Sequence, residues 1–272
     1  MKKLVLICFV LFPVITLVLA DKPRPADKPL PIGAHAHNDY EHGFPLWDAL
    51  HNGFISIEVD VHLVDGEFLV AHDVEDVQPN RTIRTMYLDP LQELHMLNRG
   101  KVYSDGSGVI LLVDVKTEEP GTWRALREVL MDYKEMLSFY RDGIVVEDSV
   151  TVVISGNRDW QAMSADHNCP AFYDGRIEDL YINPDSGLIP LISAGWGDEF
   201  AWEGQGEIPE KDRVKMLGII EKAHTQGRKV RFWGTDVPDE ALQKQIWDLL
   251  LDSGVDFINT DKLEKFRSYL GL

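Results

Sequence analysis

The sequence is poor in cysteine, in basic residues and in long apolar runs. Its two cysteines are Cys8 and Cys169, and Cys8 lies in an N-terminal segment that resembles a removable leader. A single remaining cysteine allows no internal disulfide, so an exported protein of this kind would depend on a large core rather than on cross-links. Internal repeats and low-complexity segments are also absent. A chain of 272 residues therefore suits one large domain.

Basic residues are few relative to acidic ones. Lysine and arginine together number 27, against 45 aspartates and glutamates, which gives a formal net charge of −18. Such a protein repels nucleic acid and anionic membrane surfaces, so we expect neither as a macromolecular partner. If a small-molecule substrate carries phosphate, a cation at the site should help to neutralise it. Nothing in the composition fixes the oligomeric state.

The one long apolar run lies at the N-terminus, from Leu4 to Leu19. It follows Lys2-Lys3 and ends in small residues, which predicts a secretory signal peptide over 1–20 and a secreted or periplasmic protein. The alternative is an uncleaved anchor, although the run is short for a membrane span. Cleavage would change the formal charge from −18 to −20, because Lys2 and Lys3 are lost. Residues 21–31 are proline-rich and charged and predict a linker, and the remaining domain spans 32–272.

Strand and helix patterns alternate through this domain. Strands are predicted at 30–36, 55–61, 109–116, 150–155, 171–173, 188–193, 229–233 and 255–259, and helices at 45–52, 88–99, 123–139, 159–165, 211–226, 239–253 and 263–270. The run VILLVDVK is almost wholly apolar, as in a parallel strand buried on both faces. At this length, such alternation favours an α/β fold with a closed (β/α)8 TIM barrel as a single domain.

The most informative stretch is IEVDVHLVDGEFLVAHD, residues 57–73. Its period of two places Glu58 and Asp60 on one face of a strand. Asp65-Gly66 then offers a tight turn, and the returning strand would bring His72 back towards the two carboxylates. The alternative is a half-exposed edge strand with ordinary surface polarity.

Polar residues recur at the predicted strand ends. They are His35 and His37, Glu58 and Asp60, Asp114 and Lys116, Ser155, Trp233, and Asn259 to Asp261. In a parallel barrel the chemistry gathers at the carboxyl ends of the strands. We therefore expect these side chains around one pocket.

Glu58, Asp60 and Asp114 supply three carboxylates, a ligand set that suits one divalent cation, Mg²⁺ or Ca²⁺. Ion pairing with Lys116 is the alternative explanation for these acids. His37 and His72 come from different strands, so they could flank a bound group, one accepting a proton and the other donating it. Each histidine by itself could equally be structural.

Three segments resemble a known family. IEVDVHLVDGEFLVAHD is similar to the E-x-D…DG…HD core of the glycerophosphodiester phosphodiesterase and phosphatidylinositol phospholipase C-like superfamily. LLVDVK resembles its L-x-E-x-K strand, with Asp114 in place of glutamate, and VRFWGTD and GVDFINTDKLEKF resemble its late segments. The opening HAHNDYEHGF resembles a branch in which H-x-H-N-D-Y replaces H-R-G and the P-E-N-T segment is absent.

The resemblance implies a (β/α)8 barrel with one divalent cation. By position, Glu58, Asp60 and Asp114 would bind the metal, and His37 and His72 would form the acid–base pair. Residues implied to bind substrate are His35, Asn38, Lys116 and Trp233. Two departures leave questions open: His35 could replace His37 as the first histidine, and Asn38 stands where an arginine usually follows. Phosphate binding could be weaker, or the substrate different.

Our hypothesis from the sequence is an exported, metal-dependent phosphoric diester hydrolase. Its substrate would be a small diester resembling a glycerophosphodiester or a phospholipid headgroup. A two-zinc amidohydrolase or phosphoesterase is one alternative, because His35-x-His37 suits zinc. It would need further histidines at later strand ends. A barrel that binds phosphorylated or sugar ligands without catalysis is the other alternative.

Overall fold

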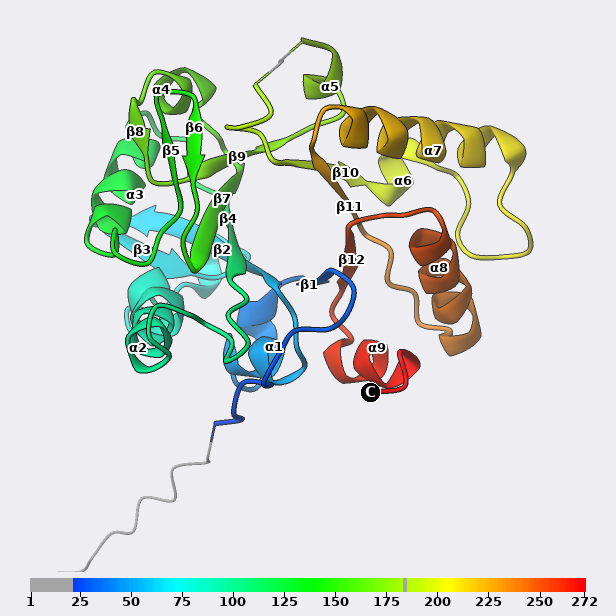
Figure 1. Ribbon diagram of the computed structural model, residues 1–272, viewed down its shortest axis with the longest axis horizontal. Coiled ribbons are helices and arrows are strands. Elements are labelled where there is room, and N and C mark those ends of the chain that lie inside the picture. The colour runs from blue at the N-terminus through cyan, green and yellow to red at the C-terminus, as the bar shows by residue number, and fades with distance from the viewer. Residues whose placement is uncertain (1–21, 183–184) are drawn as a thin grey trace, which may run out of the picture.

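Eight parallel strands form a closed barrel with helices around its outside (Figure 1). The computed structural model describes residues 22–182 and 185–272, so the predicted signal peptide lies outside the described residues. The barrel strands are β1 (Ala34–Ala36), β2 (Ser56–Val64), β4 (Val109–Val115), β7 (Val150–Gly156), β9 (Phe172–Gly175), β10 (Leu191–Gly195), β11 (Lys229–Trp233) and β12 (Phe257–Thr260). Neighbouring strands follow chain order, and the pairing of β1 with β2 closes the ring. The predicted TIM barrel is confirmed.

The helices between the strands agree with most of the predicted ones. They are α1 (Trp47–His51), α2 (Asp89–Leu97), α3 (Thr122–Met131), α4 (Trp160–Ser164), α5 (Asp179–Ile182), α6 (Trp196–Glu199), α7 (Glu210–Thr225), α8 (Glu240–Asp252) and α9 (Leu263–Tyr269). Short turns of helix add η1 (Asp39–Glu41), η2 (Val74–Asp76) and η3 (Arg84–Leu88). Among the described residues, no helix is both long and apolar enough to cross a membrane.

The interior of the barrel is layered, because side chains in a strand alternate between its two faces. An apolar cluster fills one level and consists of Leu112, Val153, Phe172, Leu191 and Phe257. Two residues further along the same five strands, on the same face, come Asp114, Ser155, Asp174, Ser193 and Asn259. The period of two therefore places a polar layer at the carboxyl ends of the strands, above an apolar floor.

The outward-facing residues of the strands build the main core. Val59 of β2, Val113 of β4 and Val152 of β7 are completely buried and belong to the cluster that packs the helices against the barrel. Because both faces of these strands are covered, the strands read as nearly continuous apolar runs in the sequence.

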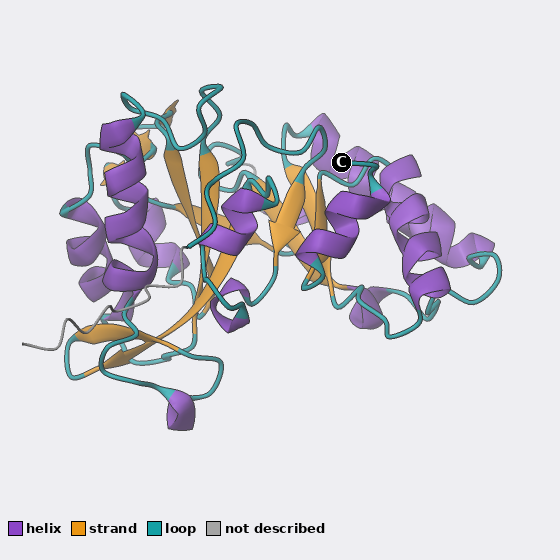
Figure 2. Cartoon of the chain, turned by 90° about the horizontal axis from the view of Figure 1, so that it is seen from below, coloured by secondary structure: helices purple, strands orange, loops and turns teal. Residues whose placement is uncertain are grey.

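Strand β2 continues beyond its barrel neighbours and pairs antiparallel with β3 (Glu67–Val70). This hairpin stands out from the end of the barrel in the side view of Figure 2. Asp65 and Gly66 form its turn with positive φ angles of 50° and 88°, as a two-residue hairpin turn requires. The predicted hairpin is confirmed.

A predicted long helix is wrong. We expected a helix over 123–139, but α3 ends at Met131, and a second hairpin follows, with β5 (Phe139–Arg141) and β6 (Ile144–Val146). This hairpin turns at Asp142 and Gly143, which both have positive φ angles, as a tight two-residue turn requires. Together with β8 (Asn168–Cys169), the hairpin forms a separate three-stranded sheet.

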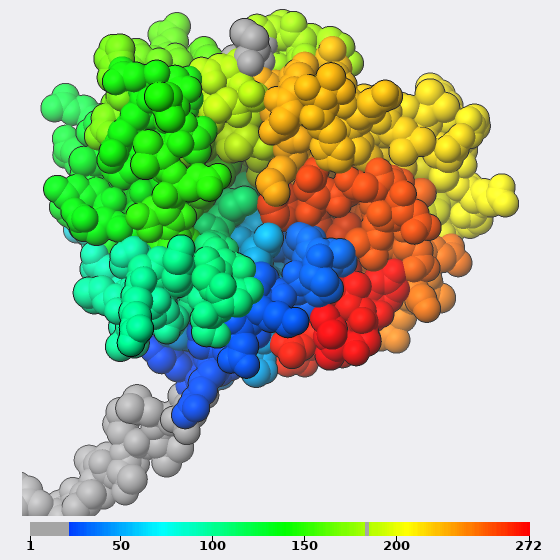
Figure 3. Space-filling model, in the orientation of Figure 1, coloured from blue at the N-terminus to red at the C-terminus, as the bar shows by residue number. Residues whose placement is uncertain are grey.

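The proline-rich segment has neither helix nor strand from Lys22 to Pro31. It nevertheless packs on the barrel: the amide of Ala26 donates to the carbonyl of Leu50, and that of Leu30 to the carbonyl of Gly53. Figure 3 shows this part of the chain, in blue, between the teal segments around α2 and the red helix α9. Segments far apart in sequence thus meet on this face.

Candidate functional site

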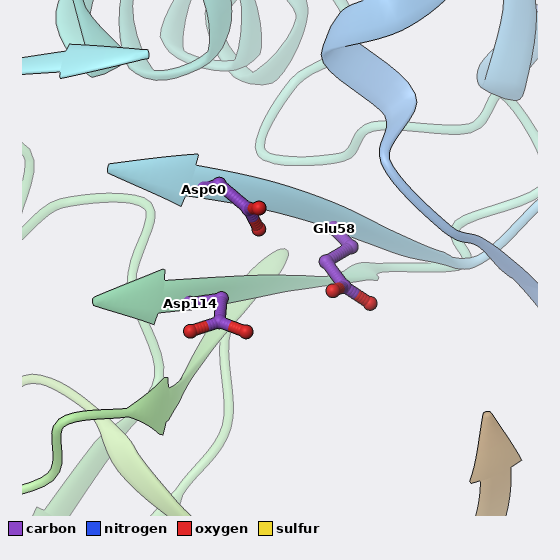
Figure 4. A group of neighbouring side chains, drawn as sticks. All are labelled: Glu58, Asp60 and Asp114. Atoms are coloured by element: carbon purple, nitrogen blue, oxygen red, sulfur yellow. The ribbon is translucent and has the colours of Figure 1, made fainter. Parts of the chain in front are cut away.

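Three carboxylates meet at the carboxyl ends of two neighbouring strands. One carboxylate oxygen from each of Glu58, Asp60 and Asp114 lies within 4.8 Å of the others. The three side chains project from the same side of β2 and β4 (Figure 4). Asp60 and Asp114 are register partners across the two strands, so adjacent strands bring together residues that are 54 positions apart. This is the arrangement expected of a cation site.

Glu58 is also held from the opposite side of the barrel. Its Oε2 atom lies 2.5 Å from Nη1 of Arg231 and 2.7 Å from Nε2 of His35. Burial alone would raise the pKa of Glu58, but the positive charge of Arg231 and the hydrogen bond with His35 lower it well below its usual value. Glu58 is therefore ionised at every physiological pH.

Asp60 is a buried carboxylate with one unused oxygen. Its Oδ2 accepts hydrogen bonds from the Tyr40 hydroxyl at 2.8 Å and from Lys116 Nζ, which lies 3.0 Å away. Burial and the negative charge of Glu58 raise its pKa to about 6, while Lys116 opposes the rise. Its Oδ1 is buried and has no hydrogen-bond partner among the described residues.

These residues fit a divalent cation. A buried carboxylate oxygen without a partner is costly unless something else binds it, and Asp60 Oδ1 is such an atom. The three carboxylates repel one another and offer oxygen ligands, which suit a hard cation such as Mg²⁺ or Ca²⁺. Glu58, Asp60 and Asp114 would hold the ion.

Lys116 follows Asp114 by two residues and lies on the same face of the strand. Its Nζ is 3.0 Å from Asp60 Oδ2 and 3.3 Å from Asp114 Oδ2. The ion pairing that the sequence offered as an alternative is thus present. The same position at the mouth leaves Lys116, about a quarter exposed, able to contact an anionic ligand as well.

The two histidines of the first strand have different surroundings. His35 is completely buried between Ser56, Glu58 and Arg231, and burial and the charge of Arg231 lower its pKa to about 4. His37 is partly exposed, and its Nδ1 lies 2.7 Å from Oδ1 of Asp261. A neutral, enclosed His35 can support Glu58, whereas His37 lies near the surface beside Asp261.

His72 lies just after the β2–β3 hairpin. Val70 pairs with Val61 in antiparallel register, so the chain after Val70 runs back along β2 towards Asp60. The imidazole of His72 is 56% exposed and its Nδ1 is 3.3 Å from Asp73 Oδ1. The hairpin therefore returns the backbone of His72 along β2, whereas the side chain contacts Asp73, and its role in catalysis stays a prediction.

Two predicted substrate contacts lie at the rim. Asn38 has a left-handed backbone conformation directly after the first strand, and its Oδ1 accepts a hydrogen bond from Tyr40 at 3.2 Å. Trp233 ends β11 and is 40% exposed. A Cβ atom at Gly195 would lie only 2.8 Å from the Trp233 ring, so the ring lies directly against this glycine. Trp233 thus offers an exposed apolar surface at the carboxyl end of β11.

Three further residues belong to this site. The sequence pattern predicts Arg231 only as part of a strand, although it forms the ion pair with Glu58. Tyr40 and Asp174 are not among the predicted site residues. The alternation in KVRFW does place Arg231 and Trp233 on one face, which is a signal for Arg231. Tyr40 contacts Asp60 from η1, a turn of three residues that is too short to show a period.

The fold and the acidic cluster define a TIM-barrel protein with a candidate cation site at the carboxyl ends of its strands. Residues 26–174, more than half of the chain, match the family model of the AIM6-like phosphodiesterase domain. The chain therefore belongs to the family of AIM6-like phosphodiesterase domains, which is consistent with the superfamily that its motifs resemble.

Curated fungal proteins are similar over most of the chain. Altered inheritance of mitochondria protein 6 from Lachancea thermotolerans is 28% identical over 279 residues, covering 85% of this chain and 64% of that protein. A homologue from Arthroderma benhamiae is 24% identical, covering 88% of this chain and 84% of that protein. The protein of the same name from Saccharomyces cerevisiae is 24% identical over 87% of this chain and 70% of its own length.

Proposed function

We propose that this protein is an exported phosphoric diester hydrolase that depends on one divalent cation. Its substrate would be a small diester resembling a glycerophosphodiester or a phospholipid headgroup. The convergence of Glu58, Asp60 and Asp114 within 4.8 Å carries the proposal, and membership of a phosphodiesterase domain family supports it. Export rests on the signal-peptide pattern of residues 1–20.

A bound cation would draw negative charge from the phosphoryl oxygens and favour ionisation of the attacking hydroxyl. The remaining roles fall to side chains. Lys116 contributes positive charge beside the phosphate, and Trp233 packs against an apolar part of the leaving group. The chain has a net charge of −18, which repels an anionic substrate. Local positive charge is therefore needed for such a substrate to bind.

His37 is the better candidate for the first catalytic histidine. Burial alone would lower its pKa, but the hydrogen bond to Asp261 and the charge of Glu58 raise it above the usual value. A histidine beside an acid can exchange a proton with the nucleophile or the leaving oxygen. His35, with its pKa lowered to about 4, positions Glu58 instead.

His72 would act from the opposite side of the phosphate. One of the two imidazoles accepts the proton of the attacking water or substrate hydroxyl, and the other donates a proton to the departing alcohol oxygen. Attack by a neighbouring hydroxyl of the substrate would give a cyclic phosphate. The hairpin that carries His72 is attached to the strand that carries Glu58 and Asp60.

A two-zinc site receives no support from the geometry. The group of possible metal ligands among the described residues consists of carboxylates alone. His35 is already engaged by Ser56 and Glu58. Imidazole-rich coordination, which zinc prefers, is therefore not what these strand ends offer.

The test is a panel of diesters of glycerol, inositol, lysolipid and nucleotide, together with bis-(p-nitrophenyl) phosphate, assayed with Mg²⁺, with Ca²⁺ and with chelator. We expect hydrolysis that chelator abolishes and that Asp114→Asn reduces strongly. Asp76→Asn, which removes one exposed acid from the surface, is the matched control and should be unaffected. Equal activity with and without chelator would refute metal dependence, and inactivity on every diester would favour a non-catalytic barrel.

A further inference from the structure

Arg176 follows directly after β9, and its guanidinium is fixed at the mouth of the barrel by buried acceptors. Nη1 donates to Oδ2 of Asp174 at 2.7 Å, and Nη2 donates to Oγ of Ser155 at 3.1 Å. Asp174 is completely buried, and its other carboxylate oxygen accepts a hydrogen bond from Ser193 at 2.6 Å. The arginine side chain is 31% exposed. The guanidinium is therefore held by the buried side chains of Asp174 and Ser155, and part of the arginine side chain is exposed to solvent.

This guanidinium lies beside the carboxylate cluster. Ser155 is the register partner of Asp114, which is in turn the register partner of Asp60. A Cβ atom at Gly156 would lie 2.1 Å from Oδ1 of Asp114, so the Asp114 carboxylate lies directly over the end of β7. Burial would lower the pKa of Arg176, but the charges of Asp174 and Asp114 raise it.

The charged groups in the ion pairs at the mouth of the barrel include more carboxylates than cations. Four carboxylates are paired with three cations, in the combinations Glu58 with Arg231, Asp60 and Asp114 with Lys116, and Asp174 with Arg176. Their formal charges sum to −1, with Asp261 left out because its partner is His37, and one divalent cation would change the sum to +1. That value offsets the single negative charge of a phosphodiester. Without Arg176, the same site would be neutral before the substrate binds.

Of these three cations, Arg176 is the one best placed to meet a phosphate. Arg231 is only 4% exposed and is engaged with Glu58 and His35, and Lys116 already serves two carboxylates. A planar guanidinium can present two parallel N–H donors to phosphate oxygens, which a lysine cannot. Asn38, at the position where related motifs carry arginine, has no charge to offer.

We propose that Arg176 binds a non-bridging oxygen of the phosphodiester and supplies the positive charge that Asn38 lacks. The inference rests on the proposed function, because it assigns a further residue to the same pocket. Asp174 and Ser155 are positioning residues that orient the guanidinium towards the carboxylate cluster.

Binding of dimethyl phosphate, measured by titration calorimetry in the presence of Mg²⁺ or Ca²⁺, tests the proposal without requiring turnover. Arg176→Gln should weaken binding roughly 10- to 100-fold, the size expected for the loss of one hydrogen bond to a charged group. Arg176→Lys should fall between Arg176→Gln and the wild type. Arg124→Gln, which removes one positive charge from an exposed position on α3, is the control and should bind as the wild type does.

Arg176→Gln leaves the buried carboxylate of Asp174 without its cation, so this variant risks misfolding. The double variant Asp174→Asn/Arg176→Gln removes both charges and provides a second test. Dimethyl phosphate affinity equal to that of the wild type in either variant would overturn the proposal, as would the absence of binding to the wild type. Binding without hydrolysis of any diester would instead reject the hydrolase and keep Arg176 as an anion-binding residue.

Discussion

Nδ1 of His37 lies 2.7 Å from Oδ1 of Asp261, which joins the loop after the first barrel strand to the end of the last. The two residues are 224 positions apart, and they meet because β1 and β12 are neighbours in the closed barrel. An acid beside a histidine orients its ring and favours its protonated form. Asp261 is therefore expected to tune the proton transfer proposed for His37.

Replacing Asp261 by Asn should move one limb of the pH–rate profile to lower pH. The hydrogen bond to Asp261 is a main cause of the raised pKa of His37, and its loss lowers that pKa. If His37 acts as the base, the acidic limb moves down; if it acts as the acid, the alkaline limb does. His37→Ala should reduce kcat by about 10²–10⁴, the usual size of general acid–base catalysis. NMR titration of the His37 ring provides the independent check, and an unchanged pKa in Asp261→Asn contradicts the prediction.

Arg231 should be essential for stability because it is the buried partner of Glu58. Arg231→Met leaves Glu58 buried without its cation, and breaking such a pair costs about 3–5 kcal/mol. The double variant Arg231→Met/Glu58→Gln should lose less than the sum of the two single variants, because neither charge then lies buried alone. Urea unfolding of the four proteins gives the coupling free energy. If the changes in unfolding free energy of the two single variants add up to that of the double variant, the side chains of Arg231 and Glu58 have no interaction energy.

The contrast between Arg231 and Asp114 shows what the sequence could reveal. The sequence indicates Asp114 because an acid near the end of a continuous apolar strand is conspicuous, and the closed barrel then places it beside Asp60. Arg231 lies in a strand of mixed polarity. It is 173 positions from Glu58 along the chain, so the ion pair cannot be predicted without knowing the order of the strands. The alternation of side chains determines which residues point into the barrel. The closure of the barrel determines which of these side chains contact one another.

The error over 123–139 has a local cause. An amphipathic pattern indicates a helix but not the residue at which it ends, and here α3 ends at Met131 while Phe139 begins β5. The Asp142-Gly143 pair followed by Ile144 to Val146 has the pattern of a turn and a strand, as Asp65-Gly66 does in the first hairpin. Turn chemistry determines both hairpins, so this pair indicates a strand before it rather than the end of a long helix.

Gly195 should be required for the position of Trp233. A Cβ atom there would lie 2.3 Å from Oδ2 of Asp198 and 2.8 Å and 2.9 Å from two ring atoms of Trp233, closer than non-bonded atoms tolerate, so Gly195→Ala must displace both side chains. We expect a loss of roughly 1–3 kcal/mol in stability, typical of overpacking, and a raised KM for the preferred diester. Gly197→Ala is the matched control, since its Cβ would meet nothing within 4 Å. Equal KM values for wild type and for both Gly195→Ala and Trp233→Ala would remove Trp233 from the substrate surface.

Asp39 should make the protein less stable as the pH rises. Its carboxylate is completely buried, and burial raises its pKa to about 7 despite hydrogen bonds from the Leu46 amide and the Tyr87 hydroxyl. Between its ordinary pKa of 3.8 and about 7, the folded state keeps a proton that the unfolded state has lost, so stability falls as the pH increases.

The variant Asp39→Asn should remove this dependence, because asparagine keeps an acceptor for Leu46 but never ionises. Relative to the wild type, it should gain up to roughly 4 kcal/mol in unfolding free energy between pH 4 and pH 8, the value that a shift of about three units implies. Urea unfolding of both proteins at the two pH values measures the difference, with Asp76→Asn as an exposed control. A constant difference between Asp39→Asn and wild type at the two pH values would mean that Asp39 is ionised in the folded protein throughout, with its charge offset by groups around the Tyr87 hydroxyl.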